Sequence, residues 1–226
     1  MNDFSPRKRT PSLEKSPRIN TQQVFSGKWL KLNLAEYLDQ NNSSSSTYEY
    51  IERTTKKRDF DGVYVVGILK FPISKKPSKL ILEANFRPPI DKYVLEFPAG
   101  MIEMEDDCLG GAVRELKEET GYTPSKILEI VKNEGMLQVS PTLCIDPWKS
   151  NDCELMIIVE VDGDDEVNKD VKQDLEATEH IIVHLVDLTP NLWRDVMTLS
   201  KEKDYVIVSK LYSFITGLTL GRRLIS

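Results

Sequence analysis

The stretch GMIEMEDDCLGGAVRELKEETGY, residues 100–122, decides most of what can be inferred about this chain. Apolar residues at spacings of three and four predict a helix over residues 107–120 that buries one face. The members of this apolar stripe are Leu109, Ala112, Val113 and Leu116. Gly100 permits a tight loop before the helix, and Gly121 is typical of a helix cap after it. We therefore expect a loop and a helix that packs firmly on the rest of its domain.

A second face of this helix carries three carboxylates, Glu115, Glu118 and Glu119, because residues three and four apart are neighbours on a helix. Taken alone, an ordinary solvated glutamate face would explain them. Three close negative charges repel one another, however, and a bound divalent cation relieves that repulsion without protonation. Ligands that offer only oxygen favour Mg²⁺ or Mn²⁺ over zinc. The helix is thus a candidate metal site.

The same residues resemble the signature of the Nudix hydrolases, G-x5-E-x7-R-E-U-x-E-E-x-G-U, in which U is a bulky apolar residue. The matching positions are Gly100, Arg114, Glu115, Leu116, Glu118, Glu119, Gly121 and Tyr122. One position departs from the pattern, because Asp106 stands where the first Glu is expected and its arm is one methylene shorter. The resemblance implies an α/β fold, an α/β/α sandwich with a mixed sheet, and hydrolysis of a nucleoside diphosphate linked to another group.

Segments around the signature resemble the ADP-ribose and ADP-sugar diphosphatases. These segments are residues 48–55, 85–89, 95–100, 140–141 and 144–147. The resemblance implies that ADP-ribose or a related ADP-sugar is split into AMP and ribose 5-phosphate. It also implies a homodimer in which the N-terminal strands help to build the neighbour's nucleotide site. Two alternatives stay open: a Nudix hydrolase of a dinucleoside polyphosphate or an oxidised nucleotide, and a nucleotide-binding sensor without turnover.

The resemblance also assigns roles to the residues of the signature. Glu115, Glu119 and the backbone carbonyl of Ala99 are implied as metal ligands, with Glu118 as a third carboxylate that also serves catalysis. Arg114 is implied to be held by the carboxylate at position 106 and to orient the ligands. A base outside the helix must take the proton of the attacking water. Our candidate is Glu179 on a late acidic loop, and Glu176 is the alternative.

Substrate-binding candidates lie outside the helix. Arg53 and Arg87 are fork-shaped donors suited to phosphate oxygens, although a surface ion pair would explain each of them equally well. Trp29 and Tyr48 lie in a segment with no core of its own. Two roles are open for these side chains: stacking on adenine, or packing within the hairpin. The resemblance adds three further residues, which are Glu49, Met101 and Asp146.

The organisation along the chain predicts three parts. Residues 1–24 are expected to form a disordered basic tail, residues 25–58 a β appendage for substrate binding and dimerisation, and residues 59–226 the Nudix hydrolase domain. Strands are expected at 28–37, 48–54, 63–69, 79–85, 93–97, 126–131, 154–161 and 181–186. Two closing helices are expected at 191–199 and 205–216.

Composition restricts the compartment and the partners. The net charge is −6, and because residues 1–28 carry +4, the acidic remainder disfavours binding to nucleic acid. No apolar run is long enough to cross a membrane. Three cysteines without a Cys-x-x-Cys pair favour a reducing compartment, the cytosol. Arg7, Lys8 and Arg9 resemble a nuclear address, which is the alternative location.

Overall fold

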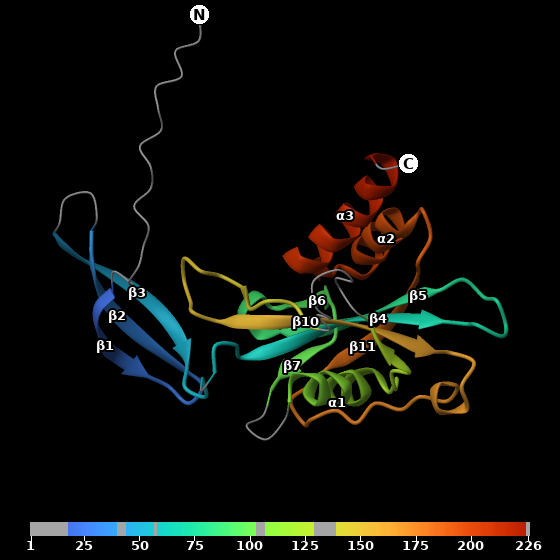
Figure 1. Cartoon of the computed structure of the whole chain (residues 1–226), viewed down its shortest axis with the longest axis horizontal. Helices are drawn as coiled ribbons and strands as arrows, with labels where there is room; N and C mark the ends of the chain where they lie inside the picture. Colours follow the sequence, from blue (N-terminus) through green and yellow to red (C-terminus); the bar gives the residue numbers. More distant parts are fainter. Residues whose placement is uncertain (1–17, 40–43, 57, 103–106, 129–138, 225–226) are drawn as a thin grey trace, which may run out of the picture. The chain divides into compact units, whose positions relative to one another are not determined.

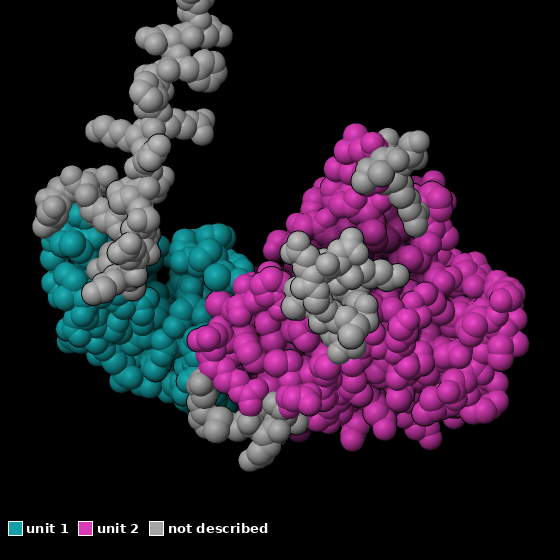
Figure 2. All heavy atoms as spheres, in the orientation of Figure 1, with its two compact units in different colours: residues 1–57, 144–152 teal, residues 58–143, 153–226 magenta. Residues whose placement is uncertain are grey.

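A computed structural model of the chain describes residues 18–39, 44–56, 58–102, 107–128 and 139–224 (Figure 1). The chain forms two compact units (Figure 2). The first comprises residues 1–57 together with 144–152, and the second comprises residues 58–143 together with 153–226. Each unit is described by itself.

The first unit is built on a three-stranded antiparallel sheet in the order β1-β2-β3. Its strands are β1 (Arg18–Ser26), β2 (Leu30–Leu38) and β3 (Ser45–Arg53). Residues 144–152 join this sheet, since the backbone N–H of Ile51 donates to Lys149 O at 2.9 Å. Asn33, Ala35 and Tyr50 are buried here. The unit is small, and every residue of β1 is exposed.

The prediction of a disordered tail over residues 1–24 is wrong for residues 18–24. These residues belong to strand β1, which begins at Arg18. The sequence RINTQQVFS gives almost no two-residue hydrophobic alternation, and a strand exposed on both faces needs none. Pairing with β2 rather than burial holds it in place, with Gln22 opposite Leu34. Residues 1–17 lie outside the described residues.

The second unit contains a mixed sheet whose main path runs β12-β6-β5-β4-β10-β8. β11 pairs with β5, β7 with β4 and β9 with β10. β4 and β10 run parallel, as do β6 and β12, whereas β5 runs antiparallel to β4, β6 and β11. The strands are β4 (Gly62–Lys70), β5 (Lys79–Arg87), β6 (Lys92–Glu96), β7 (Ala99–Met101), β8 (Lys126–Ile127), β9 (Leu143–Cys144), β10 (Cys153–Asp162), β11 (Ile181–Asp187) and β12 (Val206–Ile207).

Helices cover both faces of this sheet, with α1 (Cys108–Thr120) on one face and α2 (Leu192–Lys203) and α3 (Ser209–Leu224) on the other (Figure 1). Alternation along β4 shows why. Val65 belongs to the same core as Leu116 of α1, whereas its neighbour Val66 belongs to the core of Val196 and Leu211 on α2 and α3. The predicted α/β/α sandwich with a mixed sheet and an N-terminal β appendage is thus confirmed.

Several boundaries differ from those expected. The last helix begins at Ser209 rather than at residue 205, because Val206 and Ile207 first pair with Val94 and Leu95 of β6. Strand β8 ends at Ile127, and residues 129–131 of the expected longer strand lie outside the described residues. No helix in the described ranges is both long and apolar enough to span a membrane.

Candidate active site

Helix α1 is capped at both ends by side chains and turns that the sequence supplies. Asp107 is the N-cap and its Oδ1 accepts a hydrogen bond from the N–H of Gly110. Gly121 ends the helix with φ +79°, a conformation that favours glycine. A Cβ at position 121 would also lie 2.7 Å from the backbone nitrogen of Lys172. The carboxylate-bearing turn of α1 is therefore fixed against the loop that follows β10.

Glu115 is held against the short strand β7. A Cβ added to Gly100 would lie only 1.9 Å from the carboxyl carbon of Glu115. Any residue with a side chain at position 100 would therefore clash with this carboxyl group, and only glycine fits. Gly100 itself is paired with Val63 of β4, which fixes the backbone in turn. Glu115 is consequently buried, with 8% of its surface exposed.

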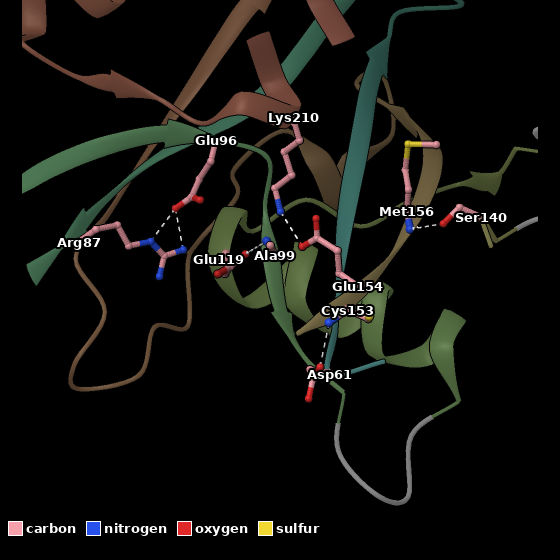
Figure 3. Close-up of polar contacts among 10 residues, drawn as sticks. All are labelled: Asp61, Arg87, Glu96, Ala99, Glu119, Ser140, Cys153, Glu154, Met156 and Lys210. Carbon is pink, nitrogen blue, oxygen red and sulfur yellow. Dashed lines mark hydrogen bonds and ion pairs between the residues drawn. The ribbon is translucent and has the colours of Figure 1, made fainter. Parts of the chain in front are cut away.

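Glu119 lies one turn further along α1 and contacts the same strand. Its Oε2 accepts a hydrogen bond of 2.8 Å from the backbone N–H of Ala99 (Figure 3). Only 2% of Glu119 is exposed. The structure thus places the carboxyl groups of Glu115 and Glu119 against Gly100 and Ala99 of β7. The contact that Ala99 makes is through its N–H, and the role expected for its carbonyl stays a prediction.

Burial and mutual repulsion raise the pKa values of both glutamates. The pKa of Glu115 rises to about 7, mainly through burial, while Arg114 acts against the rise and Glu118 and Glu179 add to it. Burial likewise raises the pKa of Glu119 to about 8, against the effect of the Ala99 N–H. These buried, mutually repelling oxygens fit a divalent cation, which would replace the protons that they otherwise retain.

Arg114 contacts two of the carboxylates, those of Glu115 and Glu118. Its Nη2 lies 2.9 Å from Glu115 Oε1 and donates to Met101 O at 3.2 Å, while its Nη1 donates to Glu118 Oε2 at 2.8 Å. Among the described residues, no three Asp, Glu, His or Cys side chains already form a metal cage. A cation would have to compete with Arg114 for both carboxylates. Asp106 lies outside the described residues, so its expected contact with Arg114 stays a prediction.

The loop before β11 is attached to the end of α1. Gln173 Nε2 donates to Glu119 O at 2.6 Å, and Asp174 N donates to Glu118 O at 2.8 Å. Further along this loop, Glu179 is close enough that its charge raises the pKa values of both Glu115 and Glu119. Glu176 is exposed, and its backbone N–H donates to Glu179 Oε2 at 2.9 Å. Of the two candidate bases, Glu179 is the one whose carboxylate acts on the site.

Arg87, the phosphate-binding candidate of this unit, is engaged in an ion pair. Its Nε and Nη2 donate to Glu96 Oε1 at 2.9 Å and 2.7 Å, as Figure 3 shows. Glu96 is buried, and its burial raises its pKa, an effect that Arg87 opposes. Met101 lies at the end of β7 and is 38% exposed. The ion pair is the alternative that the sequence left open for Arg87.

The first unit carries Trp29 and Arg53 at one end of its sheet. Trp29 lies in the turn between β1 and β2 and is 61% exposed, with Lys28 Nζ 4.6 Å from its ring centre. Its backbone carbonyl accepts a hydrogen bond from Thr54 N at 3.0 Å. Arg53 pairs in the sheet with Leu30, and its Nε lies 3.9 Å from Asp152 Oδ1.

Tyr48 lies elsewhere on the same sheet, opposite Ala35. It is five residues from Arg53, roughly 17 Å along the strand. Its hydroxyl donates to Trp148 O at 2.6 Å, and its ring lines a pocket of about 510 Å³. Glu49 is exposed, and Asp146 Oδ2 lies 2.7 Å from Lys149 Nζ. The first unit of one chain thus keeps the two expected stacking residues apart.

Sequence reasoning missed Glu83, which lies within the apolar strand β5 and is completely buried. Among the described residues, none donates a hydrogen bond to either of its carboxyl oxygens. Burial, followed by the nearby Glu119 and Glu96, raises the pKa of Glu83 well above its usual range. The sequence did contain a signal for Glu83. A glutamate between Leu82 and Ala84 is unusual in a strand whose other residues are typical of a buried core.

The NUDIX domain model matches residues 65–198, more than half of the chain and the whole of the site on α1. The chain belongs to the Nudix family. Its relatives in that family include two that align over most of the chain. An ADP-sugar pyrophosphatase from Mus musculus is 32% identical over 218 residues, which cover 92% of this chain and 91% of that protein. An ADP-ribose pyrophosphatase from Saccharomyces cerevisiae is 29% identical over 196 residues, which cover 87% of this chain and 79% of that protein.

A solved structure supports the fold. The crystal structure of an ADP compounds hydrolase superposes with a TM-score of 0.55 at 19% identity. The match covers 84% of this chain and 86% of that one. At this identity the likeness establishes the shared architecture of the two chains.

Proposed function

We propose that this Nudix hydrolase cleaves the diphosphate of ADP-ribose or a related ADP-sugar, releasing AMP and ribose 5-phosphate, with Mg²⁺ as its cation and Mn²⁺ as a substitute. The observation that carries the proposal is the packing of Glu115 and Glu119 against residues 99–100. Support for the substrate class comes from relatives named ADP-sugar and ADP-ribose pyrophosphatase that align over most of the chain.

Each residue of the site then has a part. Glu115, Glu119 and the carbonyl of Ala99 would hold the cation, with Glu118 as the more exposed third carboxylate. When bound, the cation neutralises phosphate charge and acidifies water. Arg114 orients Glu115 and Glu118, which it already contacts.

Proton transfer falls to Glu179, whose charge acts on both buried ligands. Water attacks one phosphorus, its proton passes to the Glu179 carboxylate, and the bond from that phosphorus to the bridging oxygen breaks. The second phosphate leaves with the bridging oxygen. Arg87 and Arg53 would bind phosphate oxygens. To do so, Arg87 would have to release Glu96, and Arg53 would have to turn from Asp152.

The nucleotide end would be bound by the first unit, where Trp29 and Tyr48 stack on the base and Glu49 and Asp146 supply acceptors. Trp29 and Tyr48 are too far apart within one sheet to stack on the same base. The proposal therefore includes a homodimer, in which one nucleotide site contains Trp29 of one chain and Tyr48 of the other. Exposed apolar residues on β1, Ile19, Val24 and Phe25, are consistent with such pairing. The proposed compartment is the cytoplasm, which suits three free cysteines.

A product assay tests this function. The protein is incubated with Mg²⁺ and a panel comprising ADP-ribose, an ADP-hexose, a dinucleoside polyphosphate and an oxidised nucleoside triphosphate. We expect AMP from the first two, and none after excess chelator. Faster turnover of the last two would favour another Nudix substrate, and binding without any product would favour a sensor.

A further inference from the structure

Gln173 closes the loop that carries Glu179. Its Nε2 donates hydrogen bonds to two backbone carbonyls, that of Glu119 at 2.6 Å and that of Ile181 at 3.2 Å. Ile181 is the first residue of β11 and lies eight positions further along the chain, whereas Glu119 lies in the last turn of α1. One side chain therefore joins both ends of the loop over residues 174–180 to the end of the helix.

The chemistry of the glutamine amide fits both contacts. Backbone carbonyls accept hydrogen bonds and do not donate them, so the NH₂ end of the side chain must face them. Its two hydrogens then serve one carbonyl each. A glutamate of the same length offers only acceptors and would repel both carbonyls. The closure of the loop thus depends on the donors at position 173.

The backbone beside Gln173 adds a further bond to the same helix end, because Asp174 N donates to Glu118 O at 2.8 Å. Carbonyls in the last turn of a helix have no partner within the helix, so bonds from outside satisfy groups that otherwise face water. The start of the loop is thereby attached to Glu118 and Glu119, two of the residues that we propose to bind the cation.

Glu179 is held within this loop and lies two residues before Ile181. Its Oε2 accepts a hydrogen bond from the N–H of Glu176 at 2.9 Å, and its own N–H donates to Glu176 O at 3.0 Å. Two residues of fully extended chain span at most about 7 Å. The bond from Gln173 to Ile181 O therefore limits how far the backbone of Glu179 can lie from the end of α1.

We propose that Gln173 is a positioning residue for Glu179, setting the place of this base relative to the carboxylates of α1. The inference rests on the proposed function, in which Glu179 takes the proton of the attacking water. Proton transfer depends steeply on position, because the base must come within hydrogen-bond reach of that water. Gln173 contacts neither substrate nor cation in this role and acts through the loop alone.

A double-mutant cycle in the full chain tests the role. It is measured by steady-state AMP release from ADP-ribose at saturating Mg²⁺, and by Mn²⁺ affinity in isothermal titration calorimetry. Gln173→Met keeps the length of the side chain and removes both donors. We expect kcat to fall roughly 10–100-fold, the scale of a small misplacement of a reacting group, while KM and the Kd for Mn²⁺ stay within about threefold. The fold should tolerate the change, since Gln173 is exposed.

The other side of the cycle is Glu179→Gln, which removes the base and should lower kcat by at least about 10²-fold. Adding Gln173→Met to Glu179→Gln should lower kcat by less than about threefold more, because the group that Gln173 positions is already lost. Thr178→Ala changes an exposed side chain of the same loop and is the matched control. It should keep the wild-type kcat.

Losses that multiply in the double variant would overturn the role, because Gln173 would then act by a route other than Glu179. Weaker Mn²⁺ binding in Gln173→Met would also overturn it and would show that Gln173 supports Glu119 instead. Wild-type kcat in Gln173→Met would have the same meaning, and Gln173→Ala is measured if Gln173→Met does not fold. Wild-type activity in Glu179→Gln would remove the base and this proposal together. Absence of AMP release from the wild-type protein would instead overturn the proposed function.

Discussion

The carboxyl group of Glu115 occupies the space that a side chain at position 100 would need. Glycine is needed at this position because it leaves room for the Glu115 carboxyl group, which packs between α1 and the backbone of β7. Its conformational flexibility is not the reason. A methyl group here must displace Glu115 or separate the strand from the helix. Either movement would disturb the group expected to bind the cation.

Gly100→Ala should therefore reduce turnover of ADP-ribose by at least about 10²-fold, on the scale of losing one preorganised electrostatic contact. Steady-state AMP release and Mn²⁺ affinity are the measurements. Gly217→Ala on α3 is the control, since a Cβ there meets nothing within 4 Å. That variant should keep full activity and gain up to about 1 kcal/mol of stability. Equal activities in the two variants would contradict the role given to Gly100.

Glu119→Gln keeps the size of the side chain and removes the charge that we propose to hold the cation. We expect turnover to fall by at least about 10²-fold, and metal binding to weaken in parallel. Glu166→Gln serves as the control, because Glu166 lies on the surface and pairs with Lys169. A loss smaller than threefold in Glu119→Gln would remove Glu119 from the ligand set.

Arg114→Lys keeps the positive charge but loses the planar fork that contacts Glu115 and Glu118 at once. The expected cost is roughly 10–100-fold in kcat/KM, as for other residues that orient metal ligands. Single-turnover kinetics at saturating Mg²⁺ would report it. Activity at the wild-type level would mean that the contacts of Arg114 serve the metal-free state alone.

The raised pKa values of Glu115 and Glu119 predict how pH acts on the metal-free protein. At these two groups the folded state binds more protons than the unfolded one, so their contribution to the free energy of unfolding is greatest below pH 4.5 and is lost as pH rises through about 7 and 8. Metal binding requires these protons to leave, so the rise in thermal midpoint caused by Mg²⁺ should grow between pH 6 and pH 9. A rise that is constant over this range would contradict the assignment.

Trp29→Ala tests the proposed stacking on adenine. A contact made equally in the ground state and the transition state should affect KM alone, by roughly 5- to 150-fold for about 1–3 kcal/mol. The fold should tolerate the change, because the side chain is 61% exposed. Trp193→Ala on α2 is the control and should leave KM unchanged. A fall in kcat at constant KM, or loss of a dimer in gel filtration, would instead give Trp29 an architectural role.

Most of the Nudix body could be predicted from the sequence, since its long strands contain continuous apolar runs and α1 has apolar residues at helical spacing. The proposed metal-site residues on α1 follow from their spacing together with the signature. By contrast, β1 pairs with β2 and has no buried face, so periodicity could not detect it. Short strands such as β12 depend on a neighbour already in place, and their own two residues contain no pattern.

Which groups pair with one another could not be read from the sequence. The sequence around Arg87 is the same whether its side chain binds phosphate or Glu96. Which carboxylate lies beside Arg87 is decided by the register of β5 against β6. Glu83 was overlooked for the same reason, because the sequence of β5 does not show which acidic groups of other elements will affect its pKa.

The attachment of residues 172–174 to the last turn of α1 has a consequence for local opening. A helix end normally frays, but here the carbonyls of Glu118 and Glu119 are bound by Asp174 and Gln173 from outside the helix. Amide hydrogen exchange should therefore report the last turn of α1 and this loop as one cooperative unit, exposed together or not at all. Glu119, a proposed metal ligand, would then be released to solvent only when the chain leading to Glu179 detaches as well.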